Sequence, residues 1–355
     1  MKTKKLLENY LALVKNYLPE KKANKPSIGL DIGTHSCKLI EVIPAEHGFQ
    51  ILNWAVEPIG HSGPDEVIKK ILNKLDIQAK NISTAVAGQG TLIRYIEMPR
   101  MPLKDAKKSF ALEADKYFPF PKDQIYTDCY IVDPERLDNR MLLLVAAAKK
   151  EIIDQRIKLL SDLGLQPDFV GINAIALANV FHMLAEKVPE ASDSATPDAT
   201  AIVDIGESVS SLVILKGNTP YFTRDILIGG KEINKRISNV LGIGIEEAEK
   251  VKYQPGDNLQ NIMGACETIL TNLASEVRLS FDYFLTEHNM QISKVYLTGG
   301  SSLLGGAKDF FSKNLDTPTE QWNPVSLCQL LPGVLEEEIK KNSNYLGVAL
   351  GLALY

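Results

Sequence analysis

Cysteine is scarce in this chain of 355 residues, and the four cysteines lie far apart. None belongs to a C-x-x-C pair, which argues against a zinc site or a disulfide framework and favours a reducing environment. The sequence also has no apolar stretch long enough to span a bilayer, and its N-terminal part lacks the features of a signal peptide. We therefore expect a cytoplasmic protein. The cysteines are Cys37, Cys129, Cys266 and Cys328.

The sequence also has no excess of positively charged residues. Lys and Arg number 39 against 44 Asp and Glu, a net charge of −5, which argues against a nucleic-acid partner. The charge is uneven, because residues 1–25 hold seven lysines and only two glutamates. Apolar side chains in residues 6–18 recur at helical spacing. We expect residues 1–26 to be a basic amphipathic segment that lies on an anionic membrane, docks on protein or is disordered in isolation.

What the sequence does contain is a phosphate-binding pattern at residues 28–42. An apolar run ends at Asp31, Gly33 permits a tight reversal, and polar residues lead into a second β-branched-rich run. Such a turn offers a polyphosphate backbone N–H groups, hydroxyls and the Lys38 cation, while Asp31 can hold a water of hydrated Mg²⁺. An ordinary hairpin has the same pattern, so that alternative stays open. The expected site residues are Asp31, Gly33, Thr34, His35, Ser36 and Lys38.

The same design recurs at residues 201–215, where Asp204 and Gly206 again follow an apolar run. Internal duplication of such a hairpin implies two like domains facing one ligand. At residues 294–303 a third apolar run ends in a glycine pair, where the backbone can approach a flat ring or a sugar closely. With the glycine that opens the helix after the second hairpin, the further site residues are Asp204, Gly206, Ser208, Gly230, Gly299, Gly300 and Ser301.

The order of these three elements resembles the actin-like ATPase superfamily, where they are the phosphate-1, phosphate-2 and adenosine motifs. The resemblance implies an α/β fold of two lobes with ATP and Mg²⁺ between them, Asp31 and Asp204 facing the metal through water. It assigns residues 27–91, 171–198 and 334–355 to the first lobe (subdomain 1A) and residues 199–333 to the second (subdomains 2A and 2B).

Residues 92–170 have a different pattern, in the order β-α-β-β-α, which describes a small α+β module. A strand at residues 166–171 is expected to complete this module. Its aromatic residues at 117–120 are expected mainly to cap the module's own core. The predicted strands are 94–99, 125–132 and 141–148, and the predicted helices are 103–116 and 150–163.

Several segments narrow the resemblance to the PilM family of type IV pilus assembly proteins. The most specific are EADKYFPFP at residues 113–121 and AAAKKE at residues 146–151, with LASEVRLSFDYF, VYLTGGSSLLGG and NYLGVALGLAL in support. The resemblance covers residues 27–355 and implies that residues 92–170 form an inserted module of the FtsA type, called 1C. Proteins of the FtsA type continue into a membrane-binding helix, so the end of this chain at Tyr355 favours PilM.

The resemblance also assigns roles to single residues. Asn173 lies where hydrolysing members carry the residue that orients the attacking water. Its shorter amide would place that water poorly, which predicts weak or absent hydrolysis, although Asn173 could equally cap a helix. Glu249 and Lys252 match a pair that contacts the ribose and base, or else form an ordinary exposed i,i+3 ion pair. His35 stands where relatives usually have a serine, so it could change the affinity for a nucleotide or the choice of nucleotide.

Taken together, the resemblance implies an ATP-binding scaffold, peripheral to the inner membrane, that binds the N-terminal peptide of a PilN-like protein. The first lobe and the module would hold this peptide. Pilus ATPases and further copies of the chain, arranged as a ring, are the other implied partners. The alternatives are a polymerising ATPase like FtsA and a small-molecule kinase. The kinase is supported least, because the sequence has no conspicuous catalytic aspartate for an acceptor pocket.

Overall fold

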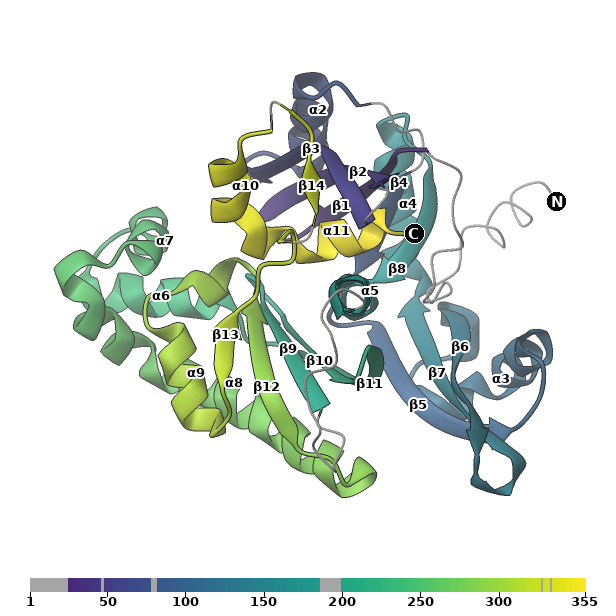
Figure 1. The fold of residues 1–355 in the computed structure, drawn as a ribbon. Helices are drawn as coiled ribbons and strands as arrows, with labels where there is room; N and C mark the ends of the chain where they lie inside the picture. Colours follow the sequence, from purple (N-terminus) through teal and green to yellow (C-terminus); the bar gives the residue numbers. More distant parts are fainter. Residues whose placement is uncertain (1–24, 46–47, 78–81, 186–198, 327, 333) are drawn as a thin grey trace.

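The computed structural model describes residues 25–45, 48–77, 82–185, 199–326, 328–332 and 334–355. The predicted amphipathic segment therefore lies almost entirely outside the described residues, as does most of the stretch between the first lobe and residue 199. The described chain forms two lobes and a smaller module beside them (Figure 1). Among the described helices, none is both long enough and apolar enough to cross a membrane.

The first lobe is built on a sheet with the strand order β14-β3-β2-β1-β4-β8. Neighbouring residues on β2 point to opposite faces, so Leu39 packs toward α2 and α4 while Ile40 packs toward α5 and α11. Helices on both faces explain why apolar residues on both faces of the central strands are buried. The elements are β1 Ser27–Ile32, β2 Ser36–Ala45, β3 Gly48–Pro58, α2 Pro64–Lys74, β4 Ile82–Val86, α4 Lys150–Asp162, β8 Pro167–Ile172, α5 Asn173–Ala185, β14 Gln329–Leu330, α10 Glu336–Asn342 and α11 Gly347–Ala353.

The second lobe has a sheet with the order β11-β10-β9-β12-β13. Its long helix α8 buries Leu270, Val277 and Phe284 against the sheet, and these residues recur at helical spacing. The elements are β9 Ala199–Ile205, β10 Ser210–Lys216, β11 Thr219–Ile226, α6 Gly230–Leu241, α7 Ile245–Tyr253, α8 Leu259–His288, β12 Ile292–Thr298, α9 Ala307–Leu315 and β13 Thr319–Gln321.

Helices α5 and α11 lie between the two sheets and pack very closely on their neighbours. A Cβ on Gly29 of β1 would stand 1.8 Å from the carbonyl oxygen of Ala349 in α11. A Cβ on Gly351 would stand 1.9 Å from the carbonyl oxygen of Ala176 in α5. Glycine is therefore required where α11 meets β1 and where it meets α5, because each contact is made by backbone atoms.

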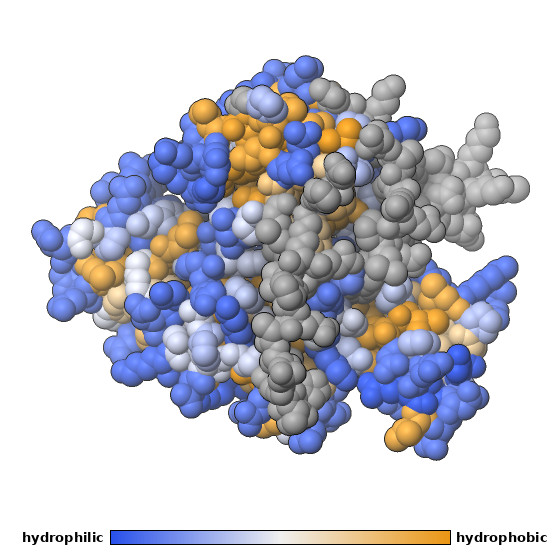
Figure 2. All heavy atoms as spheres, in the orientation of Figure 1, coloured by the Kyte–Doolittle hydropathy of each residue, from blue (hydrophilic) through white to orange (hydrophobic). Residues whose placement is uncertain are grey.

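The inserted module is a three-stranded sheet, β5-β7-β6, with α3 on one face. That face holds Phe110 and Phe118 together with Cys129, so the aromatic residues do cap the module's core as predicted. The other face packs toward the lobes through Leu144 and Ala146. Apolar surface is visible on this part of the molecule in Figure 2, between hydrophilic regions. The elements are β5 Thr91–Pro99, α3 Leu103–Tyr117, β6 Ile125–Arg136 and β7 Arg140–Lys149.

One predicted strand belongs elsewhere. Residues 166–171 were expected to complete the module, but they form β8, which pairs in parallel with β4 in the first lobe. The physical reason lies in α4, whose Leu160 is buried with Ile28 and Leu30 against the first sheet. The chain thus returns to the first lobe through α4, a helical crossover between parallel strands. An apolar strand after a helix fits either sheet, so the pattern alone could not decide. The domain boundaries as a whole stay a prediction.

The first lobe, the module and the second lobe meet at Gly88, in the turn between β4 and β5. The N–H of Gly88 donates to Oδ2 of Asp225 on β11, at 2.7 Å. The other carboxylate oxygen, Oδ1, accepts from Oγ of Ser211 on β10, at 2.6 Å. Asp225 therefore joins the second lobe's sheet to the point where the chain enters the module.

Candidate functional site

The β1–β2 hairpin forms one wall of the candidate site. Its turn closes with a hydrogen bond of 3.1 Å from the N–H of Gly33 to the carbonyl of Ser36. Asp31 and Lys38 stand opposite each other across the hairpin and form an ion pair of 3.0 Å. Burial works against the charge of Lys38, but Asp31 beside it, with Asp204 opposite, offsets this and raises the pKa of the ammonium. This wall carries its own internal ion pair.

The β9–β10 hairpin forms the opposite wall with the same turn, closed by the N–H of Gly206 and the carbonyl of Val209 at 3.1 Å. The residue across from Asp204 is Ser211 rather than a lysine. Burial and the nearby charge of Asp31 raise the pKa of the half-buried Asp204 to about 7. Near neutral pH, Asp204 therefore lacks the charge compensation that would keep it fully ionised.

The glycine pair after β12 forms the third wall. Gly299 has a φ of 83°, and a Cβ there would stand 2.3 Å from Oδ1 of Asp204. A Cβ on Gly300 would meet the ring of Tyr345 at 2.5 Å. Both positions require glycine, the first for its positive φ as well as for space. Oγ of Ser301 donates to the carbonyl of Gly206 at 3.2 Å and ties this wall to the second hairpin.

These three walls enclose one cleft of about 240 Å³. Two hydroxyls meet across it, since Oγ of Ser208 donates to Oγ1 of Thr34 at 3.2 Å. Most of the residues expected at the site line this cleft, namely Asp31, Gly33, Thr34, His35, Ser36, Lys38, Asn173, Asp204, Gly206, Ser208, Glu249, Gly299, Gly300 and Ser301. The duplicated pattern therefore does converge on one space.

Two of the expected residues, Gly230 and Lys252, stand behind the wall rather than on it. The N–H of Gly230 donates to the carbonyl of Gly206 at 2.8 Å, which holds the second hairpin's turn in place. The side chain of Lys252 is fully buried and pairs with Glu249 at 3.1 Å. Lys252 and Glu249 therefore do form an i,i+3 ion pair, but it is a buried pair rather than the exposed one of the alternative. Of the two residues, only Glu249 lines the cleft.

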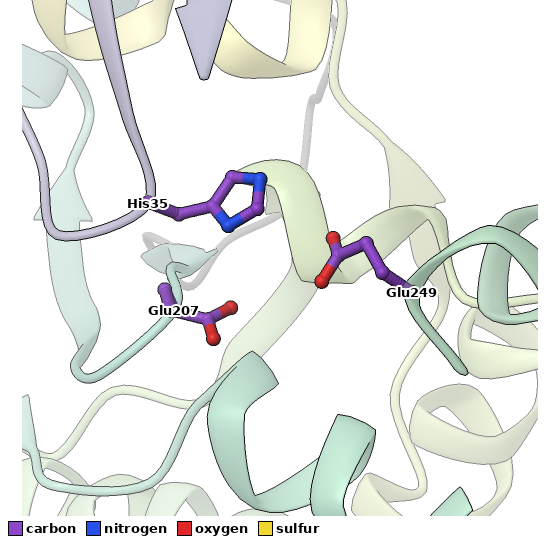
Figure 3. A group of neighbouring side chains, drawn as sticks. All are labelled: His35, Glu207 and Glu249. Atoms are coloured by element: carbon purple, nitrogen blue, oxygen red, sulfur yellow. The ribbon is translucent and has the colours of Figure 1, made fainter. Parts of the chain in front are cut away.

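A second charged group lies where the two lobes come closest. Ligating atoms of His35, Glu207 and Glu249 all lie within 4.8 Å of one another, and Figure 3 shows the histidine ring facing the two carboxylates. Burial raises the pKa of Glu207, and the charge of Glu249 adds to this, while Lys252 works against it. For Glu249 burial also acts to raise the pKa, but Lys252 and the Tyr253 hydroxyl outweigh it and the pKa is lowered.

Comparison with known proteins identifies the family to which this chain belongs. A family model for the type IV pilus assembly protein PilM matches residues 29–355. This chain belongs to the PilM family. A solved PilM-PilN type IV pilus biogenesis complex contains a chain 25% identical to this one, covering 94% of this chain and 98% of that chain, with a TM-score of 0.80. The ethanolamine utilization protein EutJ from Carboxydothermus hydrogenoformans is 16% identical, covering 100% of this chain and 97% of that one, with a TM-score of 0.51.

The PilM family and the actin-like fold of two lobes, both predicted from the sequence, are confirmed. As a PilM family member, the chain is a type IV pilus assembly protein. Neither the polymerising ATPase nor the small-molecule kinase is favoured by the comparisons.

One cleft residue of this PilM family member escaped the sequence prediction. Arg156 on α4 lines the cleft beneath the first hairpin and donates to Oγ1 of Thr84 at 3.1 Å and to the carbonyl of Ile32 at 3.2 Å. Burial lowers the pKa of its guanidinium, against the charge of Asp31. Arg156 was missed because α4 was assigned to the module, although the regular spacing of its apolar residues was visible.

Proposed function

We propose that this PilM family protein is a nucleotide-binding scaffold of the type IV pilus assembly platform, which binds the N-terminal peptide of a PilN-like protein at the inner membrane. The similarity to the chain from the PilM-PilN complex, over nearly the full length of both chains, carries the proposal. Pilus ATPases and further copies of the chain in a ring stay predictions. The scaffold's place in the cytoplasm, peripheral to the membrane, is part of the proposal.

The cleft's walls fit ATP with Mg²⁺. Phosphates would lie between the two hairpin turns, where Thr34 and Ser208 line the cleft, and the nucleoside would lie near Gly299. Asp31 and Asp204 together carry more negative charge than Lys38 balances, which suits a hard cation held through water. Bound Mg²⁺ would neutralise phosphate charge, and Arg156 would add a fixed positive charge below the turn.

The nucleotide would serve as a structural ligand rather than as a substrate for hydrolysis. Asn173, the first residue of α5, lines the cleft at the edge of the first lobe. Its amide is one methylene shorter than a glutamine, so we expect an attacking water to be poorly placed and hydrolysis to be weak or absent. Contacts from both hairpins would let one nucleotide set the angle between the lobes.

The peptide would bind between the module and the first lobe. Strand β6 is an edge strand of the module's sheet, and Tyr126 and Tyr130 on it are half-buried on the face toward the lobes. The Tyr126 hydroxyl donates to Asp154 of α4 at 3.0 Å, which connects this face to the first lobe. Aromatic side chains of this kind are frequent anchors in protein interfaces.

Titration calorimetry with Mg-ATP tests the nucleotide part. We expect wild type to bind, to release little phosphate, and to lose at least about 100-fold in affinity with Asp31→Ala or Asp204→Ala, because each removes a carboxylate of the metal site. Asp168→Ala, an exposed aspartate on β8 outside the cleft, is the matched control. Unchanged ATP affinity in both cleft variants would refute the site. Rapid turnover with an added sugar or acid would instead point to a kinase.

Fluorescence anisotropy with a labelled peptide from the cytoplasmic N-terminus of a PilN-like protein tests the partner. We expect Tyr130→Ala to weaken peptide binding by about 10-fold or more while Mg-ATP affinity stays unchanged. Tyr283→Ala removes a tyrosine that is 54% exposed on α8 of the second lobe and should have no effect. Equal binding by both variants would place the peptide elsewhere, and ATP-dependent filaments that sediment would favour a polymerising protein.

A further inference from the structure

Three potential metal ligands meet across the cleft at the point where the two lobes face each other. His35 belongs to the β1–β2 turn of the first lobe, whereas Glu207 belongs to the β9–β10 turn and Glu249 to α7 of the second lobe. Their ligating atoms lie within 4.8 Å of one another, and all three side chains are only partly exposed. Figure 3 shows the imidazole and the two carboxylates directed toward a common space.

We infer that His35, Glu207 and Glu249 form a binding site for a divalent transition-metal ion, Zn²⁺ being the best fit, that ties the two lobes together. One imidazole nitrogen and two carboxylate oxygens are ligands that Zn²⁺ accepts at about 2.0–2.2 Å. Tetrahedral geometry at that bond length places ligands about 3.4 Å apart, so small side-chain rotations close the observed spacing. Mg²⁺ prefers oxygen ligands alone, and the histidine therefore selects against it.

Glu249 is oriented for this role by the residues behind it. It accepts hydrogen bonds from Lys252 at 3.1 Å, from the Tyr253 hydroxyl at 2.7 Å and from the amide of Asn234. An ionised carboxylate accepts about four hydrogen bonds, so these three donors leave Glu249, which lines the cleft, one lone pair for a metal ion. Outer partners of this kind fix a ligand's rotamer and its charge, which is what metal sites require.

The negative charge of Glu207 favours the binding of a cation at this place. Its carboxylate lies close to Glu249, and the nearest cation, Lys252, is already paired with Glu249. Across the cleft, the facing group is His35, and no described ion pair joins it to either glutamate. Two carboxylates that share one lysine leave a charge that a divalent ion would neutralise. In the first lobe's turn, a serine in place of His35 would lack the nitrogen ligand.

This inference goes beyond the proposed scaffold function and does not depend on it, since the three ligands are separate from Asp31 and Asp204. The test is titration calorimetry of the full chain with ZnCl₂ in the absence of nucleotide, because ATP itself binds Zn²⁺. Binding of Co²⁺, followed by its visible absorption, reports the ligand set directly. We expect one ion per chain.

His35→Ser and Glu207→Gln should each weaken Zn²⁺ binding by at least about 10-fold and should reduce the Co²⁺ absorption, because each removes a ligand. His61→Ser removes an exposed histidine beside Glu246 and is the matched control. Asp204→Ala should keep Zn²⁺ binding whether or not it loses Mg-ATP, which separates this inference from the nucleotide site. Failure of wild type to bind Zn²⁺, unchanged affinity in both ligand variants, or loss of affinity in His61→Ser would overturn it.

Discussion

Hairpins β1–β2 and β9–β10 have the same turn, and each places an aspartate on the cleft. The residue that faces this aspartate across the strands differs, because Lys38 faces Asp31 whereas Ser211 faces Asp204. The first hairpin thus carries its own counter-ion, and the second does not. The two hairpins therefore share a backbone conformation, but only the one in the first lobe has a lysine opposite its aspartate. A cation that enters with a ligand is needed mainly by the second lobe.

The two hairpins also differ in what lies behind them. Gly29 of β1 lies against the backbone of α11, whereas the corresponding residue of β9, two before its aspartate, is the buried Ile202. A helix backbone in direct contact with a strand tolerates no side chain between them. The first hairpin is therefore held by close backbone packing and the second by ordinary side-chain packing.

The largest effect is expected from Gly29→Ala. The new Cβ would lie 1.8 Å from a backbone oxygen of α11, so the helix must move as a whole. We expect a loss of roughly 4 kcal/mol or more in the free energy of unfolding, measured by urea denaturation. Gly264→Ala in α8, where a Cβ meets nothing within 4 Å, is the control and should leave stability unchanged or slightly higher. Similar losses in both variants would contradict the contrast in packing.

The next effect tests the division of charge, because Asp31→Asn and Asp204→Asn should change stability in opposite directions at pH 8. Asp31→Asn leaves Lys38 without its ion-pair partner in a nearly buried place, which should cost about 2–4 kcal/mol. Asp204→Asn removes a charge that has no partner and should stabilise the ligand-free protein by about 1 kcal/mol.

The pH dependence gives the sign of the Asp204 effect. Because its pKa is raised to about 7, the folded protein holds a proton there that the unfolded chain has already released above pH 4. Its contribution to stability therefore falls as the pH rises from about 4 to 7. Denaturation at pH 5 and pH 8 should show Asp204→Asn close to wild type at pH 5 and more stable at pH 8. A difference that does not depend on pH would show that burial does not act on this carboxyl.

The smallest effect is expected where the two hairpins touch. Ser208→Ala removes the hydroxyl that donates to Thr34 across the cleft, an exposed bond of 3.2 Å. Such a bond contributes about 0.5–1 kcal/mol, so Mg-ATP affinity should fall by less than about 6-fold in titration calorimetry. Thr34→Ala should have a similar effect, and the double variant should lose no more than either single variant. Additive losses would mean that the hydroxyls act independently.

Local patterns in the sequence were enough to predict both hairpins, the glycine wall and the helices at residues 103–116 and 150–163. Strand alternation, the Asp-x-Gly turns and the spacing of apolar residues are all properties of short segments. The placement of β8, the cleft position of Arg156 and the burial of Lys252 depend on how distant segments pack. The meeting of His35 with Glu207 and Glu249 is also of this kind, since these residues come from three separate turns and helices.

The bond from Gly88 to Asp225 has a thermodynamic consequence. The Asp225 carboxylate accepts from Ser211, which lines the cleft, and from the backbone that begins the module, so both belong to one hydrogen-bonded unit. A ligand that favours one arrangement of this unit at the cleft also favours it at the module. The coupling must be reciprocal, because each ligand changes the affinity for the other by the same factor. If a nucleotide strengthens peptide binding several-fold, the peptide must strengthen nucleotide binding by the same factor.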